Sequence, residues 1–282
     1  MKIPVLFVIP ILVMGFQAAE AQNACSRVET VQEKKLVDKI IRTYHLYDCM
    51  DGTIREGLAD SHCVPLANRL QNHACRLVKK GLPEAHIYDA LNRRALTMVS
   101  FEKPLEVDLD GAPVAGDDRS PVVLTVFLCA RCPFCRVIIP QIYQAVIEGR
   151  LSSRVRLHAM LYPIKGHPGS VEGGLALEAA ARMGRFWDYL MVVYGQYNSY
   201  SVARLSPWAD SIGLDRKVFD SLRADTSVYR KVSDSKKEGI RLGVSATPSF
   251  FINGRKYLAD MDIETLIDII EEEIEKEQSR EP

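Results

Sequence analysis

The chain has 282 residues, of which 47% are hydrophobic and 26% charged, as is typical of a soluble globular protein with one large or two modest domains. Lysine plus arginine and aspartate plus glutamate number 36 each, so the formal net charge is zero. Without an excess of positive charge or a basic stripe, no nucleic-acid partner is indicated.

The first residues follow the pattern of a Sec-type signal peptide. Lys2 precedes an uncharged apolar run at residues 3–16, and Ala19-Glu20-Ala21 has the small-x-small pattern of a cleavage site. We therefore expect a signal peptide over residues 1–21, cleaved near Ala21, and export to the periplasm. This run is shorter than the roughly 20 residues of a bilayer span, and no other run is long enough, so we expect no membrane span in the mature chain.

Residues 22–100 are expected to form a helical N-terminal domain, because apolar residues recur at helical spacing in three segments. The first covers residues 36–44, the second runs from a cap at residues 60–61 to Gly81, and the third begins at Pro83. The cysteines of this part are Cys25, Cys49, Cys63 and Cys75. In an exported chain such cysteines form disulfides, and we expect one or two here, in a pairing that spacing alone does not decide.

Residues 101–120 are rich in turn residues and acids and are expected to be a linker with one short strand at residues 105–109. The pattern then changes. Residues 122–128 form a continuous apolar run that predicts a buried strand, a helix follows from Arg136, and residues 155–161 predict a second strand. This β-α-β order predicts a parallel pair with a right-handed crossover.

A long helical stretch, about residues 170–237, is expected next. A β-hairpin around Asn253-Gly254 and an acidic amphipathic helix at residues 262–276 follow it. Residues 121–282 therefore predict an α/β domain of thioredoxin-like layout with an inserted helical block, preceded by the small helical region.

The stretch CARCPFC, residues 129–135, stands between the first predicted strand and its helix. Cys132 and Cys135 have the spacing of a disulfide, and Cys132 lies where a helix offers unpaired N–H groups and the positive end of its dipole. Arg131 and Arg136 are expected to add positive potential. These features favour a thiolate at Cys132, in a class of thiols whose pKa runs from ~7 to ~3.5, against ~8.5 for free cysteine.

The C-x-x-C has two other interpretations, half of a zinc site or an ordinary structural pair. A zinc site usually has a second pair of ligands, but no cysteine follows Cys135, and neither His158 nor His167 has ligand spacing to a partner. We therefore interpret Cys132 and Cys135 as a redox pair that needs neither metal nor cofactor. Cys129 is expected to be a buried thiol outside the pair, with the alternatives that it pairs with an N-terminal cysteine or modulates the pair.

A second feature is Ala246-Thr247-Pro248-Ser249, which precedes a predicted strand. In an exported chain with a C-x-x-C, such a proline suggests a cis peptide bond, although a simple turn proline is the alternative. We expect it to leave the Thr247 backbone free to pair with an extended client strand. Pro133 and Phe134, between the two cysteines, are expected to bind the client together with Thr247 and Pro248.

The segments VFLCARCPFC, GRFWDYL, ADSIGLDRKVF and LGVSATPSFFING make residues 120–276 resemble the DsbA-like thiol-disulfide oxidoreductases of the thioredoxin superfamily. The resemblance implies that Cys132 is the exposed nucleophile, that Cys135 is the buried resolving cysteine, and that Pro248 is cis. Many relatives carry a proton-relaying acid six residues before the first cysteine, where this chain has Val126. Many also carry an aspartate where this chain has Cys129.

The N-terminal region resembles, more weakly, the cytochrome c maturation protein CcmH, in a stretch that begins YDCMDGTIREGL and ends IYDALNRR. That family has a C-x-x-C before its helices. Here Cys49 fits the first position, but Gly52 stands at the second. The departure argues against a redox role for this half, and a helical module held by disulfides remains our interpretation.

We therefore predict an exported thiol-disulfide oxidoreductase that exchanges disulfides with cysteine-containing client proteins through Cys132 and Cys135. An unidentified redox partner recycles the pair. The direction of the redox reaction, as oxidase, isomerase or reductase, is open at this point. The chain could also form a homodimer. The alternatives are a peptide- or partner-binding thioredoxin-like module, a reductant for cytochrome c maturation, and a metal carrier that adds Cys129 to the pair.

Overall fold

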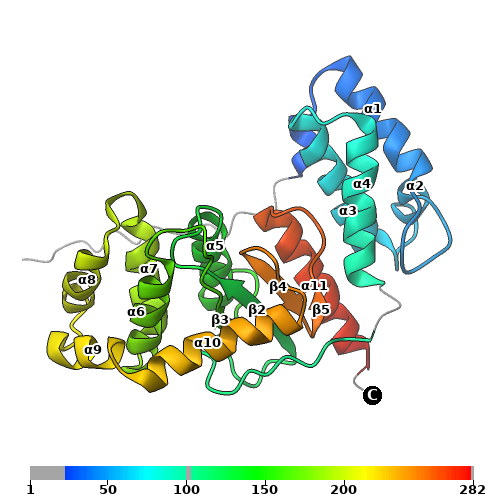
Figure 1. The fold of residues 1–282 in the computed structure, drawn as a ribbon. Helices are drawn as coiled ribbons and strands as arrows, with labels where there is room; N and C mark the ends of the chain where they lie inside the picture. Colours follow the sequence, from blue (N-terminus) through cyan, green and yellow to red (C-terminus); the bar gives the residue numbers. More distant parts are fainter. Residues whose placement is uncertain (1–22, 100–102, 281–282) are drawn as a thin grey trace, which may run out of the picture.

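The computed structural model describes residues 23–99 and 103–280. The expected signal peptide, residues 1–21, lies outside the described residues. Within them, no helix combines the length and the apolar character that a membrane span requires. Figure 1 shows a helical module, residues 23–98, beside a larger α/β part that is built on one sheet.

The helical module has a hydrophobic core of its own. Its elements are the 3-10 helix η1 (Ala24–Arg27) and the helices α1 (Val31–Thr43), α2 (Ile54–Gly57), α3 (Val64–Lys79) and α4 (Glu84–Met98). The helices α1, α3 and α4 correspond to the three segments that apolar spacing predicts. The additional helix α2 is a single turn, which begins at a capping box formed by Thr53 and Glu56.

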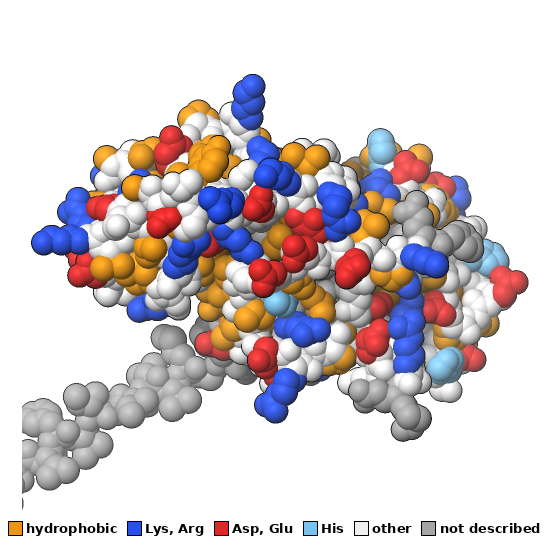
Figure 2. All heavy atoms as spheres, turned by 60° about the horizontal axis from the view of Figure 1, so that its bottom comes forward, with side chains coloured by type: hydrophobic (Ala, Val, Ile, Leu, Met, Phe, Trp, Pro, Cys, Tyr) orange, Lys and Arg blue, Asp and Glu red, His pale blue; other side chains and the backbone are white. Residues whose placement is uncertain are grey.

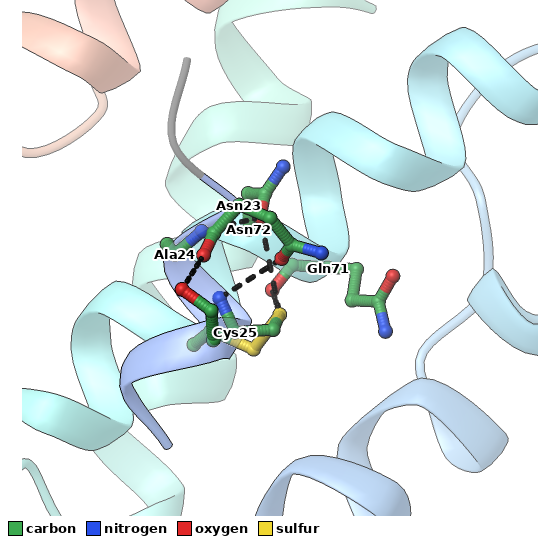
Figure 3. The surroundings of a disulfide bond; sticks show 7 residues. Asn23, Ala24, Cys25, Gln71 and Asn72 are labelled. Carbon is green, nitrogen blue, oxygen red and sulfur yellow. Dashed lines mark hydrogen bonds between the residues drawn. A yellow bond between two sulfur atoms is a disulfide. The ribbon is translucent and has the colours of Figure 1, made fainter. Parts of the chain in front are cut away.

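Two disulfides hold this module together, Cys25–Cys75 and Cys49–Cys63. The first joins η1 to α3, and Figure 3 shows its surroundings, where the Ala24 N–H also donates to Asn72 Oδ1 at 3.0 Å. The second closes the loop that contains α2. Both bonds restrict the unfolded chain, which is how a small core gains stability. The module therefore uses two disulfides, in one of the pairings that the spacing had left open.

The α/β part contains a five-stranded sheet in the order β1-β3-β2-β4-β5. The strands are β1 (Val114–Gly116), β2 (Val122–Leu128), β3 (Val155–Leu161), β4 (Ser249–Ile252) and β5 (Arg255–Lys256). β2 and β3 run parallel with Val122 opposite Val155, and the other three pairs are antiparallel. The expected α/β fold of thioredoxin-like layout, with a parallel central pair and a terminal hairpin, is confirmed.

The edges of this sheet differ from the prediction. Residues 105–109 do not form the expected strand: the Leu105 N–H donates to the Gly254 carbonyl at 2.9 Å, but no ladder follows. Val107 and Leu109 still pack against buried side chains of the sheet. Their alternation with acids therefore marks an extended segment with one buried side, and periodicity does not reveal whether backbone pairing accompanies it. The extra strand is β1, antiparallel to β3.

Helices cover both faces of the sheet. Successive side chains of β2 point to opposite faces, so Val126 joins the core with α5 (Cys135–Ile147) and α11 (Ile263–Arg280), and Phe127 lies on the other side. There Gly239 of α10 (Thr226–Arg241) approaches so closely that a Cβ would lie 3.0 Å from the Phe127 ring. The rest of the inserted block stands beside the sheet (Figure 1). It comprises α6 (Ser170–Arg182), α7 (Phe186–Gly195), α8 (Leu205–Ser211), α9 (Arg216–Arg223), and the 3-10 helices η2 (Tyr197–Ser199) and η3 (Val202–Arg204).

Helix α11 also joins the two parts of the molecule, because its acidic side meets arginines of the helical module. Arg94 is 0% exposed and forms ion pairs with Glu272 and, at 3.7 Å, with Asp268. The Tyr47 hydroxyl donates to Glu272, and Arg76 donates to Asp268 at 3.0 Å. A buried guanidinium is tolerated only with such partners, so α11 and the helical module fix each other's position.

On the surface, by contrast, positive and negative side chains are interspersed over the face that Figure 2 shows. This distribution agrees with the zero net charge of the chain.

We predict that Glu272→Gln lowers the free energy of unfolding by about 3 kcal/mol, because it leaves the buried Arg94 without its main counter-charge. Urea denaturation of the full chain measures this loss. Glu277→Gln, which removes a carboxylate that pairs with Arg280 on the surface, is the control and should stay within about 0.5 kcal/mol of wild type. Equal stability of the two variants would contradict a structural role for the buried pair.

Candidate active site

The turn between β2 and α5 places CARCPFC at the carboxyl end of the central strand. The Cys129 carbonyl accepts the Cys132 N–H at 3.1 Å, which closes the turn. The Cys135 N–H, at the first residue of α5, points at the Cys132 sulfur with an N–Sγ distance of 3.4 Å. Cys132 therefore lies at the N-terminal end of α5, where free N–H groups and the helix dipole favour negative charge.

The loop before β4 meets this turn from the other side. The Thr247–Pro248 peptide bond is cis, as the resemblance implies. When it is protonated, the Cys132 thiol donates to the Thr247 carbonyl, with the sulfur 3.0 Å from the oxygen, so this part of the Thr247 backbone is not free as expected. The Thr247 hydroxyl is buried and has no conventional hydrogen-bond partner, yet it lies near enough to both sulfurs of the pair to lower their pKa.

Cys132 is 1% exposed and Cys135 0% exposed. Burial of Cys135 agrees with the resemblance, but Cys132 is not the exposed nucleophile that the resemblance implies. Its sulfur turns inward to the Thr247 carbonyl, and the more exposed residues of the turn are Pro133 and Phe134, the latter 69% exposed. The exposed side of the turn is therefore formed by Pro133 and Phe134 and not by Cys132.

The two cysteines differ strongly in acidity. The pKa of Cys132 falls to about 5, chiefly because the Cys135 side chain hydrogen-bonds to its sulfur. The Thr247 hydroxyl and the N–H groups of Cys135 and Phe134 contribute further, and together they outweigh the effect of burial. Burial raises the pKa of Cys135 well above its usual range, and the neighbouring Cys132 adds to the effect. The site thus holds a thiolate at Cys132 and a proton on Cys135.

The two arginines that flank the pair stack on tyrosine rings. The Arg131 guanidinium lies over the rings of Tyr197 and Tyr200, with its carbon 4.6 and 4.3 Å from the ring centroids, and Arg136 lies 4.4 Å from the Tyr197 centroid. Neither is among the main causes of the low pKa of Cys132. Hydrogen bonds are the main causes of the low pKa of Cys132.

Sequence reasoning missed Tyr194 of α7, which is buried beneath the turn. Its hydroxyl donates to the Cys129 carbonyl at 3.2 Å, the same oxygen that accepts the Cys132 N–H. Burial raises the pKa of Tyr194 well above its usual range, and its neighbours Cys135, Cys129 and Cys132 add to the effect, with a side-chain hydrogen bond to Cys135. At the position of the relatives' acid, Val126 is fully buried and apolar. Only the long-range contact of α7 reveals the polar group that Tyr194 places beside the turn.

Cys129 is a free thiol, 1% exposed, as expected. Its sulfur lies 3.5 Å from Nδ1 of His167, and burial raises its pKa. Within residues 23–99 and 103–280, no three His, Cys, Asp or Glu side chains are arranged to hold a metal ion. A metal site made of Cys129, Cys132 and Cys135 therefore has no support in the geometry.

We predict that alkylation of Cys132 in the reduced protein rises with pH around a midpoint near 5. Because this pKa lies below the ~8.5 of a free thiol, the thiolate stabilises the reduced fold fully above about pH 8.5, and this contribution is lost as the pH falls toward 5. Cys135→Ala should move the midpoint upward, since it removes the main hydrogen bond. A wild-type midpoint above pH 8 would contradict the assignment.

We predict that Tyr194→Phe slows the step in which Cys135 attacks a mixed disulfide by about tenfold, since hydrogen bonds to charged groups contribute about 1.5 kcal/mol or more. Stopped-flow measurement with a mixed disulfide on Cys132 tests this. Tyr229→Phe, at a tyrosine that is 59% exposed, is the matched control and should react like wild type. Unchanged kinetics in Tyr194→Phe would show that the hydroxyl supports only the turn.

Comparison with solved structures places the fold among DsbA-like proteins. BdbD from Bacillus subtilis, in its oxidised form, matches with a TM-score of 0.54 at 20% identity, over 61% of this chain and 97% of that one. The α-DsbA1 of Wolbachia pipientis has a TM-score of 0.53 at 16% identity, over 62% and 96% of the two chains. The catalytic domain of Proteus mirabilis ScsC has a TM-score of 0.51 at 16% identity, over 66% and 98%. At such identities the likeness is one of fold.

Sequence relatives include the Na(+)/H(+) antiporter NhaA 3 of Salinispora tropica, 27% identical over 185 residues, which are 64% of this chain and 28% of that protein. NhaA 1 of Mycolicibacterium gilvum is 26% identical over 172 residues, with 60% and 27% covered. The chain thus spans less than a third of these relatives. The family model described as Thioredoxin (Thioredoxin_4) matches residues 108–272. Since this match covers more than half of the chain, the protein belongs to the thioredoxin family and has a DsbA-like thioredoxin fold.

Proposed function

We propose that this protein is an exported thiol-disulfide oxidoreductase that oxidises cysteine pairs in client proteins. The observation that carries the proposal is the surroundings of the Cys132 sulfur: the Cys135 N–H lies 3.4 Å from it, the Cys135 side chain helps to lower its pKa to about 5, and Cys135 itself is buried with a raised pKa. The value lies between the ~7 of thioredoxin and the ~3.5 of DsbA. A stabilised thiolate favours the reduced pair, and its disulfide is correspondingly oxidising. This supports the oxidase direction over the reductase and isomerase directions.

The reaction follows from this difference in acidity. A client thiolate attacks the Cys132 sulfur of the Cys132–Cys135 disulfide, the bond between the two sulfurs breaks, and Cys135 takes up a proton. A second client thiolate then attacks the client sulfur of the mixed disulfide and releases Cys132 as a thiolate. A thiol of low pKa leaves faster, so Cys132 favours this release. The client loses two electrons, the pair gains them, and a redox partner must accept them to restore the disulfide.

The client contacts that we propose lie around the same sulfur. The loop at the cis Thr247–Pro248 bond adjoins Cys132, and Pro133 and Phe134 lie on its outer side. An extended client segment along the Thr247 backbone would bring its cysteine to Cys132. Export is supported by the signal-peptide pattern of the first residues and by the two disulfides of the helical module, which persist in an oxidising compartment. The periplasm is the compartment that we propose.

We predict a reduction potential above about −200 mV for the Cys132–Cys135 pair, measured by equilibration with glutathione buffers. The oxidised protein should restore activity to a reduced, disulfide-dependent enzyme. Cys132→Ala should have no activity, whereas Cys129→Ala should keep most of it, because Cys129 lies outside the pair. A potential near the thioredoxin value of about −270 mV would exclude the oxidase and favour a reductase. Trapping on Cys135→Ser would then identify the clients.

A further inference from the structure

The side chains of Arg131, Arg136, Tyr197 and Tyr200 form a group at the edge of the turn, called here the arginine-tyrosine cluster. Both guanidiniums are held in place. Arg131 Nη1 donates to the Tyr197 carbonyl at 3.1 Å, the Tyr197 hydroxyl donates to the Arg131 carbonyl at 3.2 Å, and Arg136 Nη1 donates to Asn198 Oδ1 at 3.3 Å. The cluster joins η2 to the residues on either side of the cysteine pair.

The two guanidinium charges of this cluster have no carboxylate partner within residues 23–99 and 103–280. Among the described residues, neither Arg131 nor Arg136 forms an ion pair with an acid, although most arginines of α3, α4 and α10 do. The Nε atoms of both are buried without a hydrogen-bond partner. The acid that acts on this cluster is Glu172, which is exposed and influences Tyr200. Two ordered guanidiniums that lack an ion-pair partner form a strong recognition site for a carboxylate.

The cluster lies next to the cysteine pair, where its positive charge can act on a bound client. Arg131 directly precedes Cys132, and Arg136 directly follows Cys135. An extended client advances about 3.3 Å per residue, so a side chain two residues from the client cysteine lies about 7 Å along the chain from the reacting sulfur. Phe134 and Val137, 69% and 56% exposed, offer an apolar ridge on the first turn of α5. A client whose cysteine reaches Cys132 thus brings its neighbouring residues close to Arg131 and Arg136, which adjoin the cysteine pair.

We infer that the arginine-tyrosine cluster selects clients that carry an acidic residue within about two positions of the reacting cysteine. The inference rests on the proposed function and adds a substrate class to it. The carboxylate supplies the ion-pair partner that the two guanidiniums lack. Stacking on Tyr197 and Tyr200 limits the motion of the guanidiniums, so little side-chain freedom is lost when the client binds.

The test compares two peptides that differ only by Glu or Gln two residues before a single cysteine. Both carry the same apolar neighbour, and each rate of attack on the oxidised protein is divided by the rate of the same peptide with hydroxyethyl disulfide, which is uncharged. We expect the Glu peptide to react about fivefold faster at low salt, with the advantage lost near 1 M salt, where the Debye length is only about 3 Å. This measurement needs no variant.

Variants then locate the effect. Arg136→Gln should reduce the preference for the Glu peptide, measured as the ratio of the two normalised rates, and the change of both arginines to Gln should remove it. Arg119→Gln, at a side chain that is 90% exposed in the loop before β2, should keep the full preference. Equal rates for the two peptides with wild type would overturn the inference but leave the proposed function intact. No reaction with either peptide would instead reject the function itself.

Discussion

Hydrogen bonding to one sulfur atom, that of Cys132, is the interaction on which the chemistry of this protein depends. The groups that lower the pKa of this sulfur come from two separate regions: the Cys135 thiol and N–H at the start of α5, and the Thr247 side chain from the loop before β4. β2 and β4 are neighbours in the sheet, so their pairing brings these regions together. The low pKa of Cys132 therefore depends chiefly on the C-x-x-C, and the pairing of β2 with β4 adds the contribution of Thr247.

Two of the inserted helices, α6 and α7, also contact this turn. Tyr194 of α7 donates to the Cys129 carbonyl, and α6 approaches the turn so closely that a Cβ on Gly173 would lie 2.7 Å from the Ala130 methyl group. Gly173 leaves room for the turn, and the hydrogen bond from Tyr194 holds the turn in place. The insertion thus supports the working pair directly, and the arginine-tyrosine cluster extends this support to the surface.

Much of the fold was predictable, because it depends on local pattern. Both central strands appear at the residues where apolar runs predict them, and the hairpin forms at Asn253-Gly254, where both residues have positive φ. The features that the sequence did not predict depend on contacts between residues that are far apart in the sequence. β1 exists only as a partner of β3, and the inward turn of Cys132 depends on a carbonyl that lies more than a hundred residues away. The cysteines and the cis proline of the candidate site were predictable, but Tyr194 was not.

Helix α11 packs against both parts of the molecule. One side completes the core over β2 and α5, and the other supplies the acids that surround Arg94 of the helical module. Separating the module from the rest would leave the acids of α11 without Arg94 and Arg76, and these arginines without their carboxylate partners. We therefore expect the chain to melt in a single cooperative transition, with the disulfides of the module indirectly protecting the redox domain against heat. Because α11 packs against both parts, the stability of each part contributes to the stability of the other.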